Sequence, residues 1–248
     1  MSVLKVRIKY TKSGTMKYIG HLDVMRYFQK ATKRAGLDIA YSQGFSPHQL
    51  MSFAAPLALG VTSEGEYFDA EFNTLIPSDE FVRRYNEQMV EGMAVNDVIL
   101  LPDKAKNSMS IVAGSDYYIT ILDRDTGNAL EHDNILSFEE RKTKLLSMVS
   151  HLLEKDTIEV LRKTKKNEKV EDIKPGIFEL SVVEDKIYMF LATGSEYNLK
   201  PESVLEALCK EAGITYNKFD YQIHRLETYM KNETGALVSL LESGTRIE

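Results

Sequence analysis

The stretch Leu4-Lys5-Val6-Arg7-Ile8-Lys9-Tyr10 alternates apolar and basic side chains. Successive side chains of a β-strand point to opposite faces of a sheet, so this period of two predicts a strand with one apolar face and one basic face. We expect Leu4, Val6 and Ile8 to lie in the core, and the three basic side chains to form a row on the other face.

The segment that follows predicts a helix from His21 to Ala35, and Gly36 stands where a glycine C-cap is expected. One side of this helix is expected to carry Leu22, Met25, Phe28 or Gln29, Thr32 and Ala35. Further along, the pattern predicts a short strand within 41–60, a strand at 66–72, a helix from Ser78 or Asp79 to about residue 90, and a strand at 93–101. Strand, helix, strand, strand, helix, strand is the order of the ferredoxin-like, or split β-α-β, arrangement.

A similar order returns after a polar linker at 102–116. Strands are expected at 117–122, 157–161, 177–183, 186–192 and 221–230, with helices at 135–153 and 201–212. The sequence therefore predicts an α+β protein of two ferredoxin-like units in tandem, at 1–108 and 109–248. Residues 231–248 are expected to form a short helix or a frayed tail.

Composition limits the class of protein. The chain has 248 residues and is 43% hydrophobic, and it contains no apolar run of the roughly 20 residues that cross a membrane. The N-terminus lacks the continuous apolar stretch of a signal peptide, so we expect a cytoplasmic protein without membrane contact. Cys209 is the only cysteine and lies in an apolar pattern, which predicts a buried thiol and excludes an intramolecular disulfide. The five histidines have no metal-motif spacing, so neither a metal site nor a cofactor is expected.

The net charge of −6 conceals an asymmetry, because residues 1–50 contain nine Lys or Arg and only two acids. This balance indicates a surface that faces an anion, or else two halves that attract each other. Arg26, Lys30, Lys33 and Arg34 fall on one face of the expected helix, where phosphates would relieve their mutual repulsion. The alternative is a solvated helix face. A second basic stretch at 162–169 could contact a nucleic acid or be a solvated loop.

The segment 41–48 concentrates groups that recognise nucleotides. Tyr41 and Phe45 offer flat rings for base stacking, and Gln43 and His48 offer hydrogen bonds to base edges. Gly44 permits a positive φ and close approach of the backbone to a ligand. The alternative is a structural turn with Phe45 in the core.

His21 follows Lys17 and Tyr18 at the expected helix start, where an imidazole and backbone N–H groups could bind an anion. It is a candidate for general acid–base catalysis. The alternative is a capping or core histidine.

An ordered series of short motifs carries a family resemblance. The motifs are Lys17-Tyr18-Ile19-Gly20-His21-Leu22-Asp23, Arg34-Ala35-Gly36-Leu37, Tyr41-Ser42-Gln43-Gly44-Phe45-Ser46-Pro47-His48, Ser52-Phe53, Pro56-Leu57 and Leu59-Gly60-Val61. This series resembles the radical SAM-linked protein family, densely over residues 3–72. The resemblance implies partnership with a radical SAM enzyme and points to RNA as the substrate. The chain lacks the Cys-x-x-x-Cys-x-x-Cys that holds the cluster of such an enzyme, so it is not that enzyme.

The favoured hypothesis is an accessory protein that binds RNA, with tRNA as one candidate, and presents it to a radical SAM partner. The residues expected to bind RNA are Lys17, Tyr18, His21, Arg26, Lys30, Lys33, Arg34, Tyr41, Gln43, Gly44, Phe45 and His48. One alternative is a metal-free endoribonuclease, similar in outline to CRISPR repeat-processing enzymes. Another is a protein-interaction module that docks through the apolar run at 53–57 and makes no RNA contact.

Overall fold

The computed structural model describes residues 4–123, 136–163, 168–195 and 197–248. Its elements are α-helices and β-strands mixed along the chain, so the expected α+β class is confirmed. The residues cluster into two compact units. Unit 1 comprises Met1–Ser115, Gly194–Glu196 and Arg225–Glu248, and unit 2 comprises Asp116–Thr193 and Tyr197–His224.

Unit 1 is built on a sheet of antiparallel pairs. Its elements are β1 (Leu4–Lys12), α1 (His21–Arg34), β2 (Met51–Phe53), β3 (Thr62–Phe72), α2 (Ser78–Asn86), β4 (Met93–Leu100) and α3 (Ser108–Ile111). β1 pairs with both β3 and β4, and β2 pairs with the other edge of β3, which gives the order β4-β1-β3-β2. The predicted order of strands and helices is therefore found in this unit.

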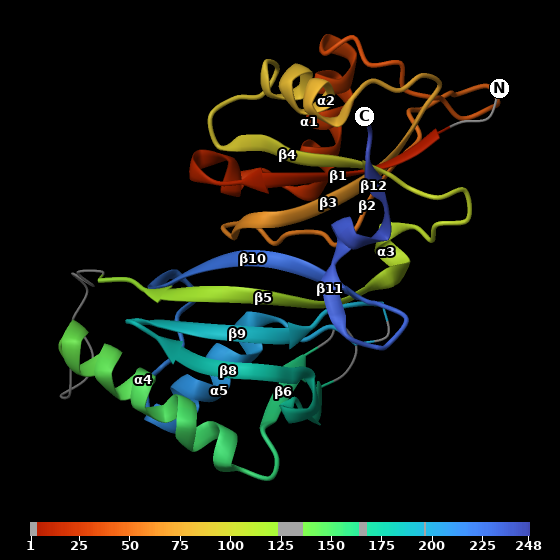
Figure 1. Cartoon of the computed structure of the whole chain (residues 1–248). Coiled ribbons are helices and arrows are strands. Elements are labelled where there is room, and N and C mark those ends of the chain that lie inside the picture. The colour runs from red at the N-terminus through yellow and green to blue at the C-terminus, as the bar shows by residue number, and fades with distance from the viewer. Residues whose placement is uncertain (1–3, 124–135, 164–167, 196) are drawn as a thin grey trace. The chain divides into compact units, whose positions relative to one another are not determined.

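The core of unit 1 lies between this sheet and the two helices, which cover the same side of β4, β1 and β3 (Figure 1). Val6 and Ile8 are fully buried, as the period of two predicts, whereas Leu4 at the end of β1 is only half-buried. Phe28 of α1 is fully buried among the rings of Tyr10 and Phe68, with ring centroids 4.7 Å away in each case.

The buried side of α1 agrees with the expected one at Phe28, Thr32 and Ala35, which are all buried, and differs from it at Leu22. Val24, Phe28 and Ala31 are buried, while Leu22 is 64% exposed. Positions 24, 28 and 31 follow the helical spacing of four and three residues, and position 22 lies about half a turn away from that stripe. The predicted glycine cap is confirmed, because Gly36 adopts φ +63° directly after the helix.

The start of α2 also differs from expectation. Its N-cap is Pro77, so neither Ser78 nor Asp79 caps the helix. The Ser78 hydroxyl instead donates to the carbonyl of Val98 at 2.6 Å and accepts from the N–H of Ile247 at 2.8 Å.

The C-terminal segment contains a short 3-10 helix, η4 (Leu240–Ser243), between two short strands, so the expected short helix is present and the segment is not a frayed tail. β11 (Leu237–Ser239) pairs with the end of β10 (Tyr221–Lys231), and β12 (Thr245–Arg246) pairs with β4. A Cβ at Gly244 would lie 2.2 Å from the carbonyl oxygen of Leu100, so only glycine permits this close approach. This pairing groups 225–248 with unit 1, whereas a division at residue 108 would place them in the second unit.

Unit 2 contains the 116–121 part of β5 (Val112–Ile121), α4 (Phe138–Glu154), β8 (Ile177–Val183), β9 (Lys186–Ala192), α5 (Pro201–Ala212) and the 221–224 part of β10. The strands follow the order β10-β5-β9-β8. β6 (Glu159–Lys163) and β7 (Glu168–Asp172) form a separate antiparallel pair. Residues 164–167 of the basic stretch lie outside the described residues. Cys209 of α5 is fully buried, as predicted, and burial raises the pKa of its thiol.

Candidate nucleic-acid interface

The four expected cations of α1 are all exposed, because they lie away from the buried stripe of the helix. Two of them have partners. Arg26 lies 3.3 Å from the carboxylate of Asp23, and Arg34 donates to the carbonyl of Gln88 at 3.0 Å. Lys30 and Lys33 make no side-chain hydrogen bond or ion pair within the described part of the chain. These two lysines are therefore the cations of α1 most available to a phosphate.

The segment at 41–49 forms a loop that is closed at its base. Tyr41 and Gln49 make an isolated β-bridge, and the N–H of Ser42 donates to the carbonyl of His48 at 2.8 Å. The Ser42 hydroxyl and the His48 Nδ1 lie 2.8 Å apart, and the same hydroxyl accepts from the N–H of His48 at 3.1 Å. These bonds fix the two ends of the loop and hold the His48 ring against Ser42.

The rings of this loop face solvent. Phe45 has a relative exposure of 110%, and Tyr41 is 41% exposed. Gly44, which precedes Phe45, has φ +111°, a backbone conformation that residues other than glycine rarely adopt. Gln43 is also exposed. The alternative of a turn with Phe45 in the core is therefore wrong.

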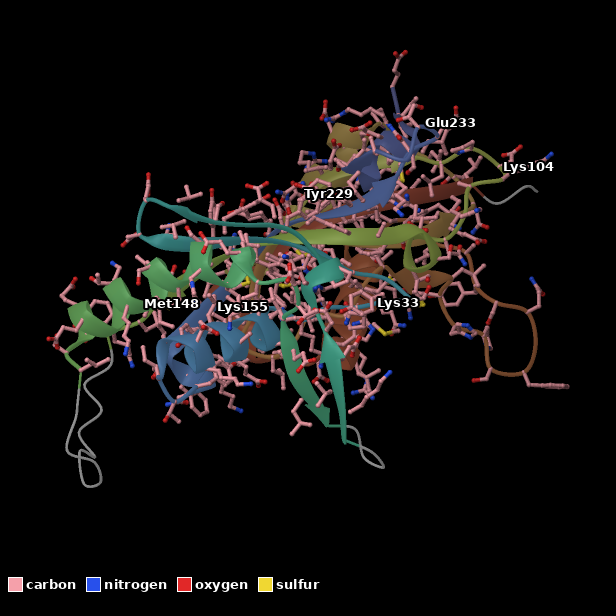
Figure 2. The ribbon with its side chains drawn as sticks, turned by 90° about the horizontal axis from the view of Figure 1, so that it is seen from below. Lys33, Lys104, Met148, Lys155, Tyr229 and Glu233 are labelled. Atoms are coloured by element: carbon pink, nitrogen blue, oxygen red, sulfur yellow. The ribbon has the colours of Figure 1, made fainter. Side chains whose placement is uncertain are left out.

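Gln49 joins the base of the loop to the basic helix. Its side chain is buried, and its Nε2 donates to the carbonyl of Gln29 at 3.1 Å and to the hydroxyl of Tyr41 at 3.4 Å. Gln29 lies one helical turn before Lys33, which is labelled in Figure 2. The exposed rings and the exposed lysines thus belong to neighbouring parts of one surface, defined here as Lys30, Lys33 and the 41–49 loop.

Lys17 and Tyr18 lie in the short 3-10 helix η1 (Gly14–Tyr18) that precedes α1. The Lys17 Nζ stands over the Tyr18 ring at 5.3 Å from its centroid, and Tyr18 is 69% exposed. The carbonyl of Lys17 accepts from the N–H of Gly60 at 2.9 Å. These contacts make a second exposed aromatic and basic pair, at the N-terminal end of α1.

His21 is the first residue of α1 and turns toward the core. Its ring meets that of Phe53 edge to face at 5.5 Å, and burial lowers the pKa of its imidazole. The nearby Glu66 carboxylate opposes this shift of the pKa, and Lys12 adds to it. The imidazole is therefore neutral at pH 7, which suits a base form but not a cation that binds phosphate.

The basic row expected on β1 is not available to a polyanion. Arg7 is fully buried, and its Nε donates to Asp69 at 2.8 Å. Lys9 pairs with Glu227 at 2.6 Å, and the Lys5 ammonium lies 3.8 Å from Asp69. β1 is a central strand whose register sets Arg7 opposite Asp69, so carboxylates of neighbouring strands neutralise the row.

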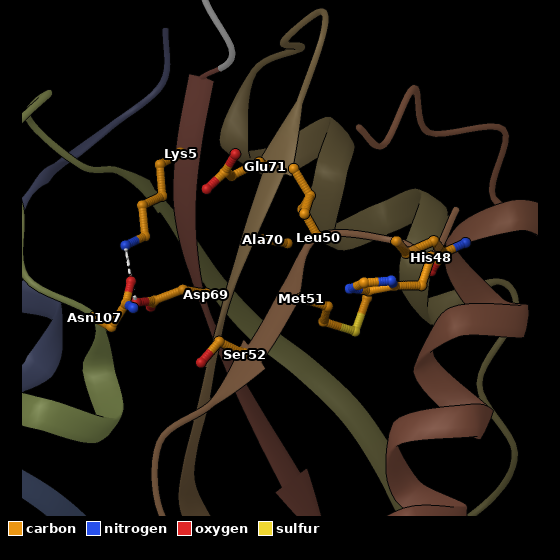
Figure 3. A pocket seen from close by; sticks show the side chains of 10 residues that line it. Lys5, His48, Leu50, Met51, Ser52, Asp69, Ala70, Glu71 and Asn107 are labelled. Atoms are coloured by element: carbon orange, nitrogen blue, oxygen red, sulfur yellow. Dashed lines mark hydrogen bonds and ion pairs between the residues drawn. The ribbon is translucent and has the colours of Figure 1, made fainter. Parts of the chain in front are cut away.

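The sequence analysis missed a pocket of about 190 Å³ at the edge of the sheet, beside β2. Its polar lining comes from Lys5, His48, Gln49, Ser52, Asp69, Glu71 and Asn107. Figure 3 shows Lys5, Asp69 and Asn107 on one side of this β2 pocket and His48 with Met51 on the other. Its residues come from four separate stretches of sequence, so no local sequence motif predicts the pocket.

The sequence also missed a buried charged group in unit 1. Arg225 donates to the carboxylate of Glu66 at 2.8 Å, and both side chains are nearly inaccessible. Lys12 is buried nearby and donates to the carbonyl of Ile19 at 2.8 Å, and burial lowers the pKa of its ammonium.

The described residues contain no group of three His, Cys, Asp or Glu side chains placed to hold a metal ion. They also contain no helix that is long and apolar enough to cross a membrane.

Comparisons with known proteins give one family and one distant likeness. Residues 5–201 match the family described as "Uncharacterized protein conserved in bacteria (DUF2344)". No curated protein matches the chain. A chain in the crystal structure of a Cbf5-Nop10-Gar1 complex is similar with a TM-score of 0.42 and 9% sequence identity, over 92% of this chain and 51% of that one. The chain thus spans about half the length of that protein, and a likeness at this TM-score carries no argument about function.

Proposed function

The chain belongs to the bacterial family described as DUF2344, and we propose that it binds unpaired RNA on the surface of Lys30, Lys33 and the 41–49 loop. The observation that carries this proposal is Phe45. Its ring is fully exposed at the far end of a loop whose base is closed by Ser42 and His48. Because the two ends of the loop are held in place, the Phe45 ring is presented to solvent in a defined position. Such a ring is suited to stack on a nucleobase that is not paired in a duplex.

The lysines of α1 supply the second component. Lys30 and Lys33 are exposed and unpaired among the described residues, so a phosphate can bind them without breaking an existing ion pair. Phosphate contacts position an RNA strand without reading its sequence, and stacking adds affinity for any base. Tyr41 offers a second ring, and Gln43 and His48 are the candidates for hydrogen bonds to base edges. The proposed surface extends along α1 through Arg26 and Arg34, and it continues to Lys17 and Tyr18 in η1.

Phosphate contacts and stacking contacts should fail differently when removed. The Lys30→Gln/Lys33→Gln variant should flatten the log–log salt dependence of single-stranded RNA binding by about 0.7 per lost contact, because fewer counterions are released. Phe45→Ala should weaken binding by on the order of 1–3 kcal/mol with an unchanged slope. Titrations of a fluorescent RNA oligomer at several salt concentrations measure both quantities.

Matched controls separate this surface from general effects of charge and hydrophobicity. Lys200→Gln/Lys231→Gln removes two exposed lysines elsewhere, and Phe219→Ala removes a ring that is 56% exposed in unit 2. Both controls should bind RNA like the wild type. If the Lys30/Lys33 and Phe45 variants also bind like the wild type, this surface does not bind RNA and protein docking takes its place.

We further propose that the bound RNA is presented to a radical SAM enzyme in the cytoplasm. This step rests on the resemblance of the motifs between residues 17 and 61. The chain cannot supply the cluster itself, since Cys209 is its only cysteine. The proposal is that the enzyme holds the cluster and this protein holds the substrate.

Co-purification tests the partner. The protein, isolated from native cells under mild conditions, should enrich a radical SAM protein over a tagged control of similar charge. Quantitative mass spectrometry measures the ratio. A preparation that enriches RNA but no radical SAM protein would contradict the partnership and leave RNA binding intact.

A catalytic alternative has its own discriminating result. A neutral imidazole at His21 could act as a base on RNA, as in metal-free endoribonucleases. Cleavage of RNA by the pure protein in a chelator, lost in His21→Ala, would favour this activity over simple presentation.

The tandem ferredoxin-like interpretation is proposed on the strand orders. Unit 1 has β4-β1-β3-β2, and unit 2 has β10-β5-β9-β8. Numbered within each unit, both give the order 4-1-3-2, with one helix after the first strand and one before the last. In this interpretation β6 and β7 are an insertion between the first helix and the second strand of unit 2.

A further inference from the structure

We propose that the β2 pocket receives one unpaired nucleobase that carries an exocyclic amino group. This inference rests on the proposed RNA binding and names the part of the RNA that the site reads. It is carried by the size of the pocket, by a buried acceptor in one lining residue, by a carboxylate in another that is unpaired among the described residues, and by the position of the pocket next to the 41–49 loop.

Size limits the ligand. The pocket holds about 190 Å³, below the roughly 300–1,000 Å³ of sites for drug-sized molecules. A single ring system is of a suitable size, whereas a dinucleotide cofactor is not. A base that has left its stack is a ligand of this kind, and proteins read such bases through their hydrogen-bonding edges.

Gln49 provides a buried acceptor. Its side chain is 7% exposed, and its Nε2 is committed to the carbonyl of Gln29 and the hydroxyl of Tyr41. The Gln29 carbonyl can only accept, so the amide atom that contacts it is the nitrogen, and Oε1 is left buried without a hydrogen-bond partner among the described residues. A buried acceptor without a partner is unfavourable, so a ligand that donates a hydrogen bond there is favoured.

Glu71 provides the second acceptor. The two carboxylates on this part of β3 differ sharply in their partners. Asp69 is saturated, because it accepts from Arg7 and from the N–H of Ser108. Glu71 lines the same pocket, and its carboxylate makes no hydrogen bond or ion pair with any described residue.

These two groups select for donors on the ligand. An unpaired carboxylate and an amide oxygen accept hydrogen bonds, which adenine, cytosine and guanine can donate from their amino groups. Uracil has no amino group, and its single N3–H can donate to only one of the two acceptors. Two carboxylates, Asp69 and Glu71, and two cations, Arg7 and Lys5, lie at or beside the pocket, so its net charge is close to zero and it does not call for a charged ligand.

His48 connects the pocket to the loop. Its ring lines the pocket while its Nδ1 is held by Ser42 at the base of the loop. Phe45 stands three residues earlier in the same loop. One RNA strand can therefore place a base on the Phe45 ring and a neighbouring base in the pocket, with the His48 ring as a further stacking surface.

The test uses uridine oligomers in which one central position is uracil, cytosine, adenine or guanine. Wild-type protein should bind an oligomer with one amino-bearing base about tenfold more tightly than the all-uracil oligomer. Glu71→Met should abolish this preference without changing the salt slope, since no phosphate contact is lost. Glu71→Gln should keep part of it, because its amide oxygen still accepts a hydrogen bond. Thermal unfolding checks that each variant is folded.

The outcomes separate this inference from RNA binding itself. If the oligomers bind in a Phe45-dependent manner but with equal affinity for all four bases, the pocket reads no base. The same conclusion follows if Glu71→Met keeps the preference. If no oligomer binds the wild-type protein, RNA binding fails, and the base pocket fails with it.

Discussion

Replacing Asp69 by Ala should lower the free energy of unfolding by about 3–5 kcal/mol. Asp69 and Arg7 are both inaccessible to solvent, and the guanidinium donates to the carboxylate from Nε at 2.8 Å and from Nη2 at 3.1 Å. Removal of the carboxylate leaves a buried cation without its counter-ion. Urea unfolding followed by circular dichroism measures the change.

The double variant Arg7→Met/Asp69→Leu is the matched control. Replacement of a buried ion pair by apolar side chains of similar volume is often neutral or stabilising, so this variant should recover much of the lost stability. If the Asp69→Ala protein is as stable as the wild type, the prediction is wrong, and other groups or water compensate the charge of Arg7.

Arg7 also explains how the C-terminal segment is held. Its Nη1 donates to Ser243 at 2.6 Å and, at 3.4 Å, to the carbonyl of Leu240. One guanidinium therefore joins β1, β3 and the short helix η4 that precedes β12. Loss of Asp69 should expose the backbone amides of 237–246 to hydrogen exchange before it affects the core of α1.

The sequence predicted the helices and strands of this fold better than the side-chain contacts between residues far apart in the chain. Alternation in β1 marks Val6 and Ile8 as core residues, and Gly36 marks the end of α1, because these signals depend on neighbours a few residues away. The same alternation suggested an accessible basic row. That prediction was wrong because Asp69, which neutralises Arg7, is 62 residues away along the chain.

The candidate site divides in the same way. The content of the 41–49 loop was visible in its sequence, but the exposure of Phe45 was not, because a lone Phe between polar residues fits a core turn equally well. The β2 pocket depends on Lys5, Glu71 and Asn107, whose proximity is a product of the sheet and has no local signature.

Replacing Phe by Ala should have very different effects on stability at the two extremes of burial. Phe28→Ala should cost about 3–5 kcal/mol of unfolding free energy, because Phe28 is fully buried and packs on Tyr10 and Phe68. Phe45→Ala should change stability by no more than about 0.5 kcal/mol, because its ring is fully exposed. Urea unfolding of both variants measures these costs.

RNA affinity should follow the opposite order. Under conditions where the Phe28→Ala variant remains folded, it should bind RNA like the wild type. Phe28 lies on the buried side of α1, whereas Lys30 and Lys33 lie on its exposed side. Phe45→Ala should be fully folded and bind weakly. If Phe45→Ala changes neither the stability nor the RNA affinity, the loop does not have the proposed role. In the expected result, Phe28→Ala lowers stability without lowering RNA affinity, and Phe45→Ala lowers RNA affinity without lowering stability.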